Sequence, residues 1–194
     1  MTDWHDEPDD ATPLSPTERD GLIPSHVALR RELNELEQQN ILAAVTWAAG
    51  RVRNPVHEPF GRNLHKRMFG NVWHWAGRYR DTDKNIGVPY WEAPLRLREA
   101  FDSTRYWIDH ASYSPDEIAV RFHHALVFIH PFPNGNGRWS RLMADLLVRS
   151  LGQPPFTWGR SSLRTADQTR AAYIAALKAA DRHDFEALVA FARS

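Results

Sequence analysis

The sequence contains no cysteine among its 194 residues. Without thiols the chain has no disulfides, no thiolate metal site and no cysteine nucleophile, as is usual in a reducing compartment. It also lacks an excess of either charge, since 24 basic residues balance 24 acidic ones. This balance argues against non-specific binding to nucleic acid or to an anionic membrane.

Long hydrophobic runs are absent too. No apolar run approaches the ~20 residues of a transmembrane helix. The N-terminus, MTDWHDEPDDATPLSPTERDG, has neither the basic stretch nor the apolar centre of a signal peptide. We therefore expect a cytoplasmic protein that uses no membrane, and the length and the 42% hydrophobic content suit one globular domain.

The pattern of elements predicts an all-α domain, residues 27–194, preceded by an irregular arm, residues 1–26. Four prolines and a run of acids oppose a helix in the arm. Residues 77–92, GRYRDTDKNIGVPYWE, mix turn formers with β-formers and predict a short hairpin flap. Apolar periodicity and capping signals predict helices over 27–53, 59–75, 93–111, 115–129, 138–151, 165–181 and 184–192.

The segment HPFPNGNGRWSR, residues 130–141, lies between two of these helices. Gly135 and Gly137 flank Asn136 and permit positive φ, so the backbone can present successive N–H groups to one anion. The helix that follows points its positive end at the same place. Gly-x-Gly loops before helices are common, so this feature is weak evidence by itself.

Three side chains strengthen the interpretation as a phosphate site. Arg138 and Arg141 stand at i and i+3, roughly on one face, and paired guanidinium groups suit a polyphosphate. His130, with an ordinary pKa near ~6.5, can take a proton from an attacking hydroxyl. Each feature has an ordinary structural alternative, a solvated arginine face or a core histidine. Their combination within twelve residues nevertheless favours a site that binds a nucleotide phosphate beside a histidine base.

The same segment resembles the signature of the Fic (Fido) fold, His-Pro-Phe-x-Asp/Glu-Gly-Asn-Gly-Arg-x-x-Arg, at every fixed position but one. The stretches LHKRMFGNVWHWAGRYR and KNIGVPYWE are also similar to that family. ELNELEQ, HPFPNGNGR and PPFTWGR resemble a Fic-related subgroup called mobile mystery protein B. The resemblance implies the Fic fold, a helical bundle with a small β-hairpin flap.

The resemblance also implies a reaction, the transfer of AMP or another nucleoside monophosphate from ATP or another nucleoside triphosphate to a Ser, Thr or Tyr hydroxyl of a target protein. The implied target-docking flap consists of Asn85, Ile86, Gly87 and Val88, which align the target by strand addition. The implied base is His130, and the implied loop anchor is Phe132. The implied anion hole consists of Gly135, Asn136 and Gly137, and the implied phosphate-binding arginines are Arg138 and Arg141.

The one departure from the signature is Asn134, which stands where the family has an acid that binds Mg2+. Asn134 keeps an oxygen but loses the negative charge that Mg2+ prefers, so we expect weakened metal binding. Slow transfer, transfer of another phosphate-containing group, or an inactive module that only binds nucleotide or protein all stay open. Gly137 disfavours phosphorylation, because the Fic-related toxins that phosphorylate their targets have lysine there.

Fic proteins are often restrained by a helix with a Ser/Thr-x-x-x-Glu-Gly/Asn motif, and this sequence has no such motif. The nearest candidates are Glu35 and Glu37, which make the first helix, 27–54, a candidate regulatory element; a solvated face is the alternative. A glutamate that reaches the site is expected to pair with Arg141. Without one, inhibition needs an antitoxin-like partner. Lys84 is interpreted as a solvated lysine.

Adjacent histidines on one helix, His123 and His124, point in different directions, so we expect no zinc site there. Trp91 and Trp139 flank the predicted site and are interpreted mainly as packing residues. The target protein, the preferred nucleotide and the oligomeric state stay open.

Overall fold

The computed structural model describes residues 12–50, 54–162 and 165–194. These residues hold no β-strand, and an isolated antiparallel bridge joins Leu22 and Trp73. None of the helices in the described part of the chain is long and apolar enough to cross a membrane. The described helices are α1 (Pro16–Arg19), α2 (Arg30–Ala49), α3 (Glu58–Phe69), α4 (Ala93–Asp109), α5 (Pro115–Ile129), α6 (Asn136–Ser150), α7 (Ala166–Ala180) and α8 (Glu186–Arg193).

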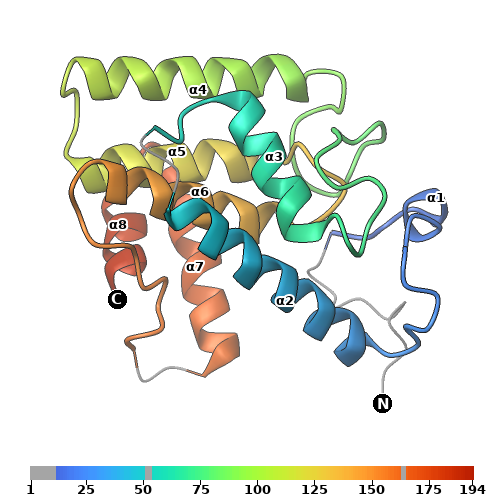
Figure 1. Cartoon of the computed structure of the whole chain (residues 1–194). Coiled ribbons are helices and arrows are strands. Elements are labelled where there is room, and N and C mark those ends of the chain that lie inside the picture. Colours follow the sequence, from blue (N-terminus) through green and yellow to red (C-terminus); the bar gives the residue numbers. More distant parts are fainter. Residues whose placement is uncertain (1–11, 51–53, 163–164) are drawn as a thin grey trace.

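Helices α5 and α6 pack against each other at the centre of the bundle (Figure 1). Helix α4 covers α5, the α2–α3 pair flanks α6, and the α7–α8 pair packs on the other side through α8 and α5. The core between them is apolar, and full burial of each such side chain contributes roughly 1.5–3 kcal/mol. Its largest fully buried members include Phe101, Phe122, Leu126, Trp139 and Met143.

The capping chemistry explains where several predicted helices begin. The Ser114 side chain accepts the Glu117 N–H at 3.3 Å, and Pro115 occupies the first turn of α5. Thr165 and Gln168 form a reciprocal capping box at the start of α7. The predicted all-α class is therefore confirmed in the described residues, with boundaries shifted by a few positions.

The second predicted helix, 59–75, was too long. Helix α3 ends at Phe69, and the chain then turns through Gly70. A Cβ at Gly70 would lie 2.4 Å from the Lys66 carbonyl oxygen, so glycine lets the backbone close against the last helical turn. The arm also differs from its prediction, because a Ser15–Glu18 capping box forms the short helix α1 within it.

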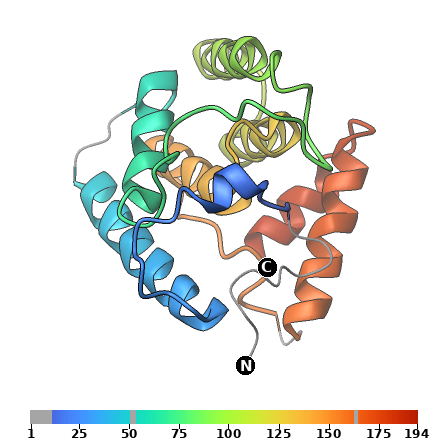
Figure 2. The same ribbon diagram turned by 90° about the vertical axis from the view of Figure 1, so that its right-hand side faces the viewer.

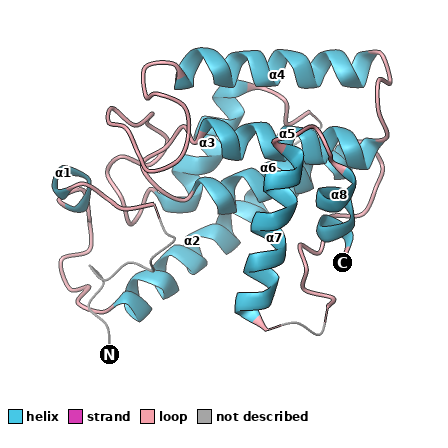
Figure 3. Ribbon diagram, turned by 180° about the vertical axis from the view of Figure 1, so that it is seen from behind, coloured by secondary structure: helices cyan, strands magenta, loops and turns pink. Residues whose placement is uncertain are grey.

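The predicted β-hairpin flap is a loop of turns and bends over residues 77–92, drawn without strands in Figure 3. Arg80 gives the physical reason. Its buried guanidinium donates to the carbonyl oxygen of Thr82 at 2.9 Å and to that of Val88. These side-chain bonds hold the two limbs of the loop where a hairpin would use a backbone ladder.

Candidate functional site

His130 stands at the end of α5 with a left-handed backbone, φ 53° and ψ 59°. The residue before a proline is disfavoured in the helical region, so the helix stops here. Arg80 holds the turn in place: its Nε donates to the His130 carbonyl at 2.7 Å and its backbone N–H to the Pro131 carbonyl at 3.0 Å. Sequence reasoning missed this role of Arg80, because its partners are distant in the chain.

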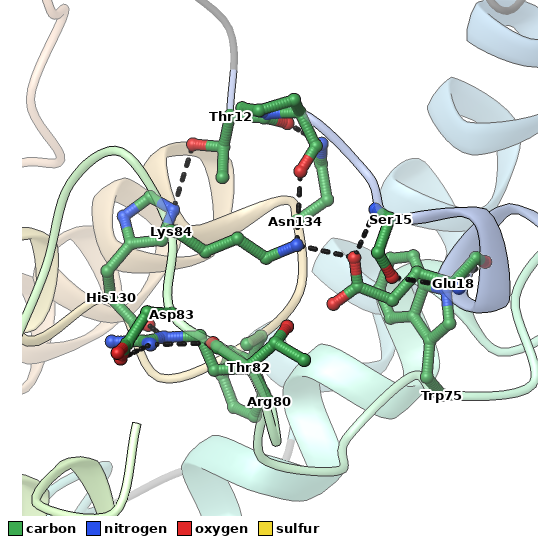
Figure 4. Close-up of polar contacts among 12 residues, drawn as sticks. Thr12, Ser15, Glu18, Trp75, Arg80, Thr82, Asp83, Lys84, His130 and Asn134 are labelled. Carbon is green, nitrogen blue, oxygen red and sulfur yellow. Dashed lines mark hydrogen bonds and ion pairs between the residues drawn. The ribbon is translucent and has the colours of Figure 1, made fainter. Parts of the chain in front are cut away.

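The imidazole of His130 is only 6% exposed. Burial lowers its pKa to about 4, and the positive charges of Arg80 and Lys84 act in the same direction, against the opposing effect of the Val127 backbone. The ring is therefore neutral at neutral pH. Its Nε2 lies 3.0 Å from the Thr12 hydroxyl oxygen, and in the tautomer with the ring proton on Nδ1 it accepts a hydrogen bond from that hydroxyl (Figure 4).

The loop after His130 is closed by an asparagine side chain. Oδ1 of Asn136 accepts the Phe132 N–H at 3.0 Å, and Nδ2 donates to the Phe132 carbonyl at 2.8 Å. Phe132 is fully buried, stacked on His65 and set edge-on against Trp139, with centroid separations of 3.8 and 4.9 Å. The structure thus places the expected loop anchor in the core and gives Asn136 a loop-closing contact.

His65 is a further positioning residue that sequence reasoning missed. It is fully buried, which lowers its pKa to about 3. Its Nδ1 accepts the Gly77 N–H at 3.0 Å, so its Nε2–H donates to the Asn134 carbonyl at 3.0 Å. His65 therefore fastens the loop to α3. Its place four residues before Phe69, on the apolar face, was the available signal.

The two glycines of the loop differ in conformation. Gly135 has φ +79°, and a Cβ there would lie 2.6 Å from the Phe69 ring. Gly137 already belongs to α6, which begins two residues earlier than predicted, and has no positive φ. The expectation that both glycines supply positive φ is therefore right only for Gly135. The first N–H groups of α6 lack acceptors within the helix.

Glu37 reaches the site, but it pairs with a different arginine from the one expected. Its side chain is 8% exposed, and its carboxylate accepts the Trp73 indole N–H at 2.7 Å and lies 2.5 Å from Nη1 of Arg138. The solvated alternative is wrong for this residue. Glu35, by contrast, is exposed and lies 3.9 Å from Arg31.

Arg141 points away from Arg138, although the two are three residues apart. Its Nε donates to the Gly137 carbonyl at 3.0 Å, and its guanidinium lies over the Tyr173 ring on α7, 5.3 Å from the centroid. Both arginines line one cavity of about 1460 Å³. This exceeds the ~300–1,000 Å³ typical of small-molecule sites. The cavity is also lined by Thr12, His130, residues 134–137 and parts of α2, α5 and α7.

Asn134 makes two hydrogen bonds that fix its orientation. Its Oδ1 accepts the Gly135 N–H at 2.6 Å, and its Nδ2 donates to the Thr12 carbonyl at 3.2 Å. The only side-chain oxygen at this position is therefore neutral and already engaged. No group of three His, Cys, Asp or Glu residues is placed to hold a metal in the described part of the chain. These residues do not fit a protein-held Mg2+.

The flap lies against the base. Ile86 and Gly87 line the cavity, and a Cβ at Gly87 would lie 2.6 Å from the His130 Cβ. Lys84 is not solvated as expected: its side chain is 3% exposed, forms an ion pair with Glu18 and donates to the Pro13 carbonyl at 3.0 Å. A buried lysine needs such partners because desolvation disfavours its charge.

The two adjacent histidines have different hydrogen-bond partners, and the two tryptophans differ in exposure. His123 bonds the Tyr173 hydroxyl at 2.9 Å, whereas His124 bonds Asp181 at 2.8 Å, so the two rings diverge as the sequence predicted. Trp139 is fully buried, and Trp91 is 63% exposed.

This geometry defines an all-α protein in which a neutral histidine and the N-terminus of α6 lie on one cavity. Residues 56–148 match the model of the Fic/DOC family. This part of the chain is similar to a Fic/DOC family domain.

Two curated relatives share part of the sequence. Protein adenylyltransferase Fic of Nematostella vectensis is 34% identical over 96 residues, 47% of this chain and 22% of that protein. Protein adenylyltransferase fic-1 of Caenorhabditis elegans is 32% identical over 132 residues, 66% of this chain and 25% of that protein. The chain thus spans about a quarter of the length of these relatives.

Solved structures share the fold. A Fic-1 fragment from Caenorhabditis elegans superposes with a TM-score of 0.67 at 25% identity, covering 90% of this chain and 51% of that one. The N-terminal Fic domain of a VirB-translocated Bep effector protein from Bartonella quintana gives 0.70 at 18% identity, covering 91% of each chain. The same domain with bound ADP gives 0.67, covering 91% of this chain and 94% of that one.

Proposed function

We propose that this protein transfers AMP, or another nucleoside monophosphate, from a nucleoside triphosphate to a Ser, Thr or Tyr hydroxyl of a protein. One observation carries the proposal: Nε2 of the neutral His130 ring lies 3.0 Å from a hydroxyl oxygen, in a cavity that also contains the first turn of α6. An acceptor hydroxyl and a phosphate chain can therefore meet there. The names of the curated relatives support AMP as the group transferred.

His130 acts as the general base in this proposal. The acceptor oxygen attacks the α-phosphorus, its proton passes to Nε2, and pyrophosphate leaves with the bonding electron pair. General bases of this kind contribute roughly 10²–10⁴ in rate. The free N–H groups at the start of α6 and the arginines Arg138 and Arg141 hold the phosphates. The loop Asn85–Val88 docks the target backbone, and ATP or another triphosphate carries any Mg2+ on its own phosphates.

We further propose that Glu37 restrains the site. Its carboxylate neutralises Arg138 at 2.5 Å, so a phosphate must displace a carboxylate to use that guanidinium. Because Glu37 lies within the chain, this restraint needs no antitoxin-like partner, although such a partner is an alternative source of inhibition. The segments ELNELEQ and PPFTWGR support membership of the mobile mystery protein B subgroup.

A second candidate function is a module that binds nucleotide or protein without turnover. The engaged, neutral Asn134 amide favours it, because the acid that would help hold a metal on the phosphates is missing.

A labelling experiment separates the two functions. The protein is incubated with α-labelled or γ-labelled ATP, Mg2+ or Mn2+, and a lysate as a source of acceptors. Transfer predicts label from the α position only, abolished by His130→Ala and retained by His110→Ala, which removes an exposed histidine at the end of α4. Label that survives His130→Ala contradicts the assigned base. Absence of label from the wild type and from Asn134→Asp, together with measurable nucleotide binding, favours the binding module.

A further inference from the structure

Residues 12–19, here called the strap, lie over the site (Figure 2). Thr12 lines the same cavity as His130 and the first turn of α6. Its hydroxyl oxygen lies 3.0 Å from Nε2 of His130 and donates to it in the tautomer that carries the ring proton on Nδ1. An acceptor that is about to lose its proton to this base must make the same contact. The chain therefore places one of its own hydroxyl groups in the acceptor position.

The strap is fixed by contacts on both sides of that hydroxyl (Figure 4). Nδ2 of Asn134 donates to the Thr12 carbonyl at 3.2 Å. Lys84 donates to the Pro13 carbonyl at 3.0 Å and pairs with Glu18, and both side chains are under a tenth exposed. The Glu18 carbonyl accepts the Trp75 indole N–H at 3.0 Å. A largely buried ion pair is a specific anchor, since either charge alone would be costly there.

The amide at position 134 fits this arrangement better than an acid does. The Gly135 N–H occupies its oxygen, which turns the NH2 group toward the Thr12 carbonyl. An aspartate has no donor to offer there and would set a negative oxygen against a carbonyl oxygen. The Asn134 side chain thus both replaces the metal-binding acid and holds the strap in place.

We propose that Thr12 is an intramolecular acceptor, so that the protein nucleotidylates its own strap. This rests on the proposed transfer function. The Thr12 oxygen forms a bond to the α-phosphorus of the triphosphate, the bond to the β-phosphate oxygen breaks, and pyrophosphate leaves. The hydroxyl proton passes to His130. Because donor, base and acceptor belong to one chain, the initial rate per molecule is independent of protein concentration.

The experiment uses the full chain with α-labelled ATP and Mg2+ or Mn2+, followed by peptide mass spectrometry. We expect AMP on Thr12, retained in Thr12→Ser and abolished in Thr12→Val. Thr17→Val is the matched control, because Thr17 is an exposed strap residue with the same side chain, and it should label as the wild type does. Mixing an excess of the His130→Ala chain with wild type should leave the inactive chain unlabelled.

Four results would overturn the inference. Self-labelling that is undiminished in Thr12→Val places the acceptor elsewhere. Label on added proteins but none on the chain leaves the transfer function standing and removes Thr12 as an acceptor. Label on the His130→Ala chain in the mixing experiment shows that the reaction runs between molecules. Loss of all transfer, to self and to added proteins, in the wild type and in Asn134→Asp refutes the proposed function as well.

Discussion

The two glycines of Asn-Gly-Asn-Gly provide a sharp test of the loop geometry, because they look alike in the sequence. In Gly135→Ala the new side chain meets two penalties. A left-handed backbone costs an L-residue about 1–2 kcal/mol, and overpacking a tight site costs about 1–3 kcal/mol. Both apply, since φ is +79° and the Cβ would lie 2.6 Å from the Phe69 ring. We expect a loss of about 2–5 kcal/mol in the free energy of unfolding.

Gly137→Ala should behave in the opposite way. Gly137 is helical, and the nearest atom to an added Cβ is the Arg141 guanidinium nitrogen at 3.8 Å. Alanine in a helix is favoured over glycine by about 0.5–1 kcal/mol, so stability should hold or rise. The new methyl group projects beside a cavity residue, so nucleotide affinity should fall instead. Urea unfolding and nucleotide titration of both variants separate the effects. Equal destabilisation by the two substitutions would refute the assigned backbone conformations.

The remaining predictions concern the buried polar groups. Glu37→Gln removes the charge that holds Arg138 but keeps an oxygen for the Trp73 indole, so ATP affinity measured by calorimetry should rise. Glu35→Gln is the control, because Glu35 is exposed. Equal ATP affinities of the two variants would contradict the restraint. His65→Phe leaves the Gly77 N–H and the Asn134 carbonyl without their partner, and we expect the free energy of unfolding in urea to fall by roughly 2–6 kcal/mol, at about 1–3 kcal/mol per group. Stability should also fall in acid, because burial lowers the pKa of His65 and His123 to about 3 and that of His130 to about 4.

The direction of the acid effect follows from proton binding. Below about pH 6.5 the unfolded histidines take up protons and the folded ones do not, so each lowers stability by up to about 1.4 kcal/mol per pH unit until its folded pKa is reached. Asp145 has the opposite effect on stability. Burial is the main cause that raises the pKa of its carboxyl group to about 6, so between its usual pKa and the raised one it increases stability as the pH falls. The histidines outnumber it, so urea midpoints should decrease between about pH 7 and about pH 5. A urea midpoint that increases as the pH is lowered through this range would contradict the buried neutral histidines.

Local patterns predicted most of the helices and the loop after His130, since each depends on residues close in sequence. What periodicity could not supply are contacts between distant segments. Arg80 holds both the flap and the His130 turn, and nothing near it in the sequence announces either partner. Glu37 did carry a signal, because it stands four residues after buried Leu33 and so shares its apolar face. The hairpin prediction failed because side-chain bonds replaced a backbone ladder.

Position 134 offers the most informative substitution, since one side chain bears on both metal and strap. Asn134→Asp removes the donor to the Thr12 carbonyl and introduces an anionic oxygen of the kind that Mg2+ prefers. We therefore expect weaker labelling of Thr12 but stronger Mg2+-dependent transfer to added proteins. Asn134→Ala removes the donor without adding a charge. It should therefore weaken self-labelling and should not increase transfer to added proteins. If Asn134→Asp increases both activities together, metal binding limits the reaction and the hydrogen bond to the strap does not position the acceptor.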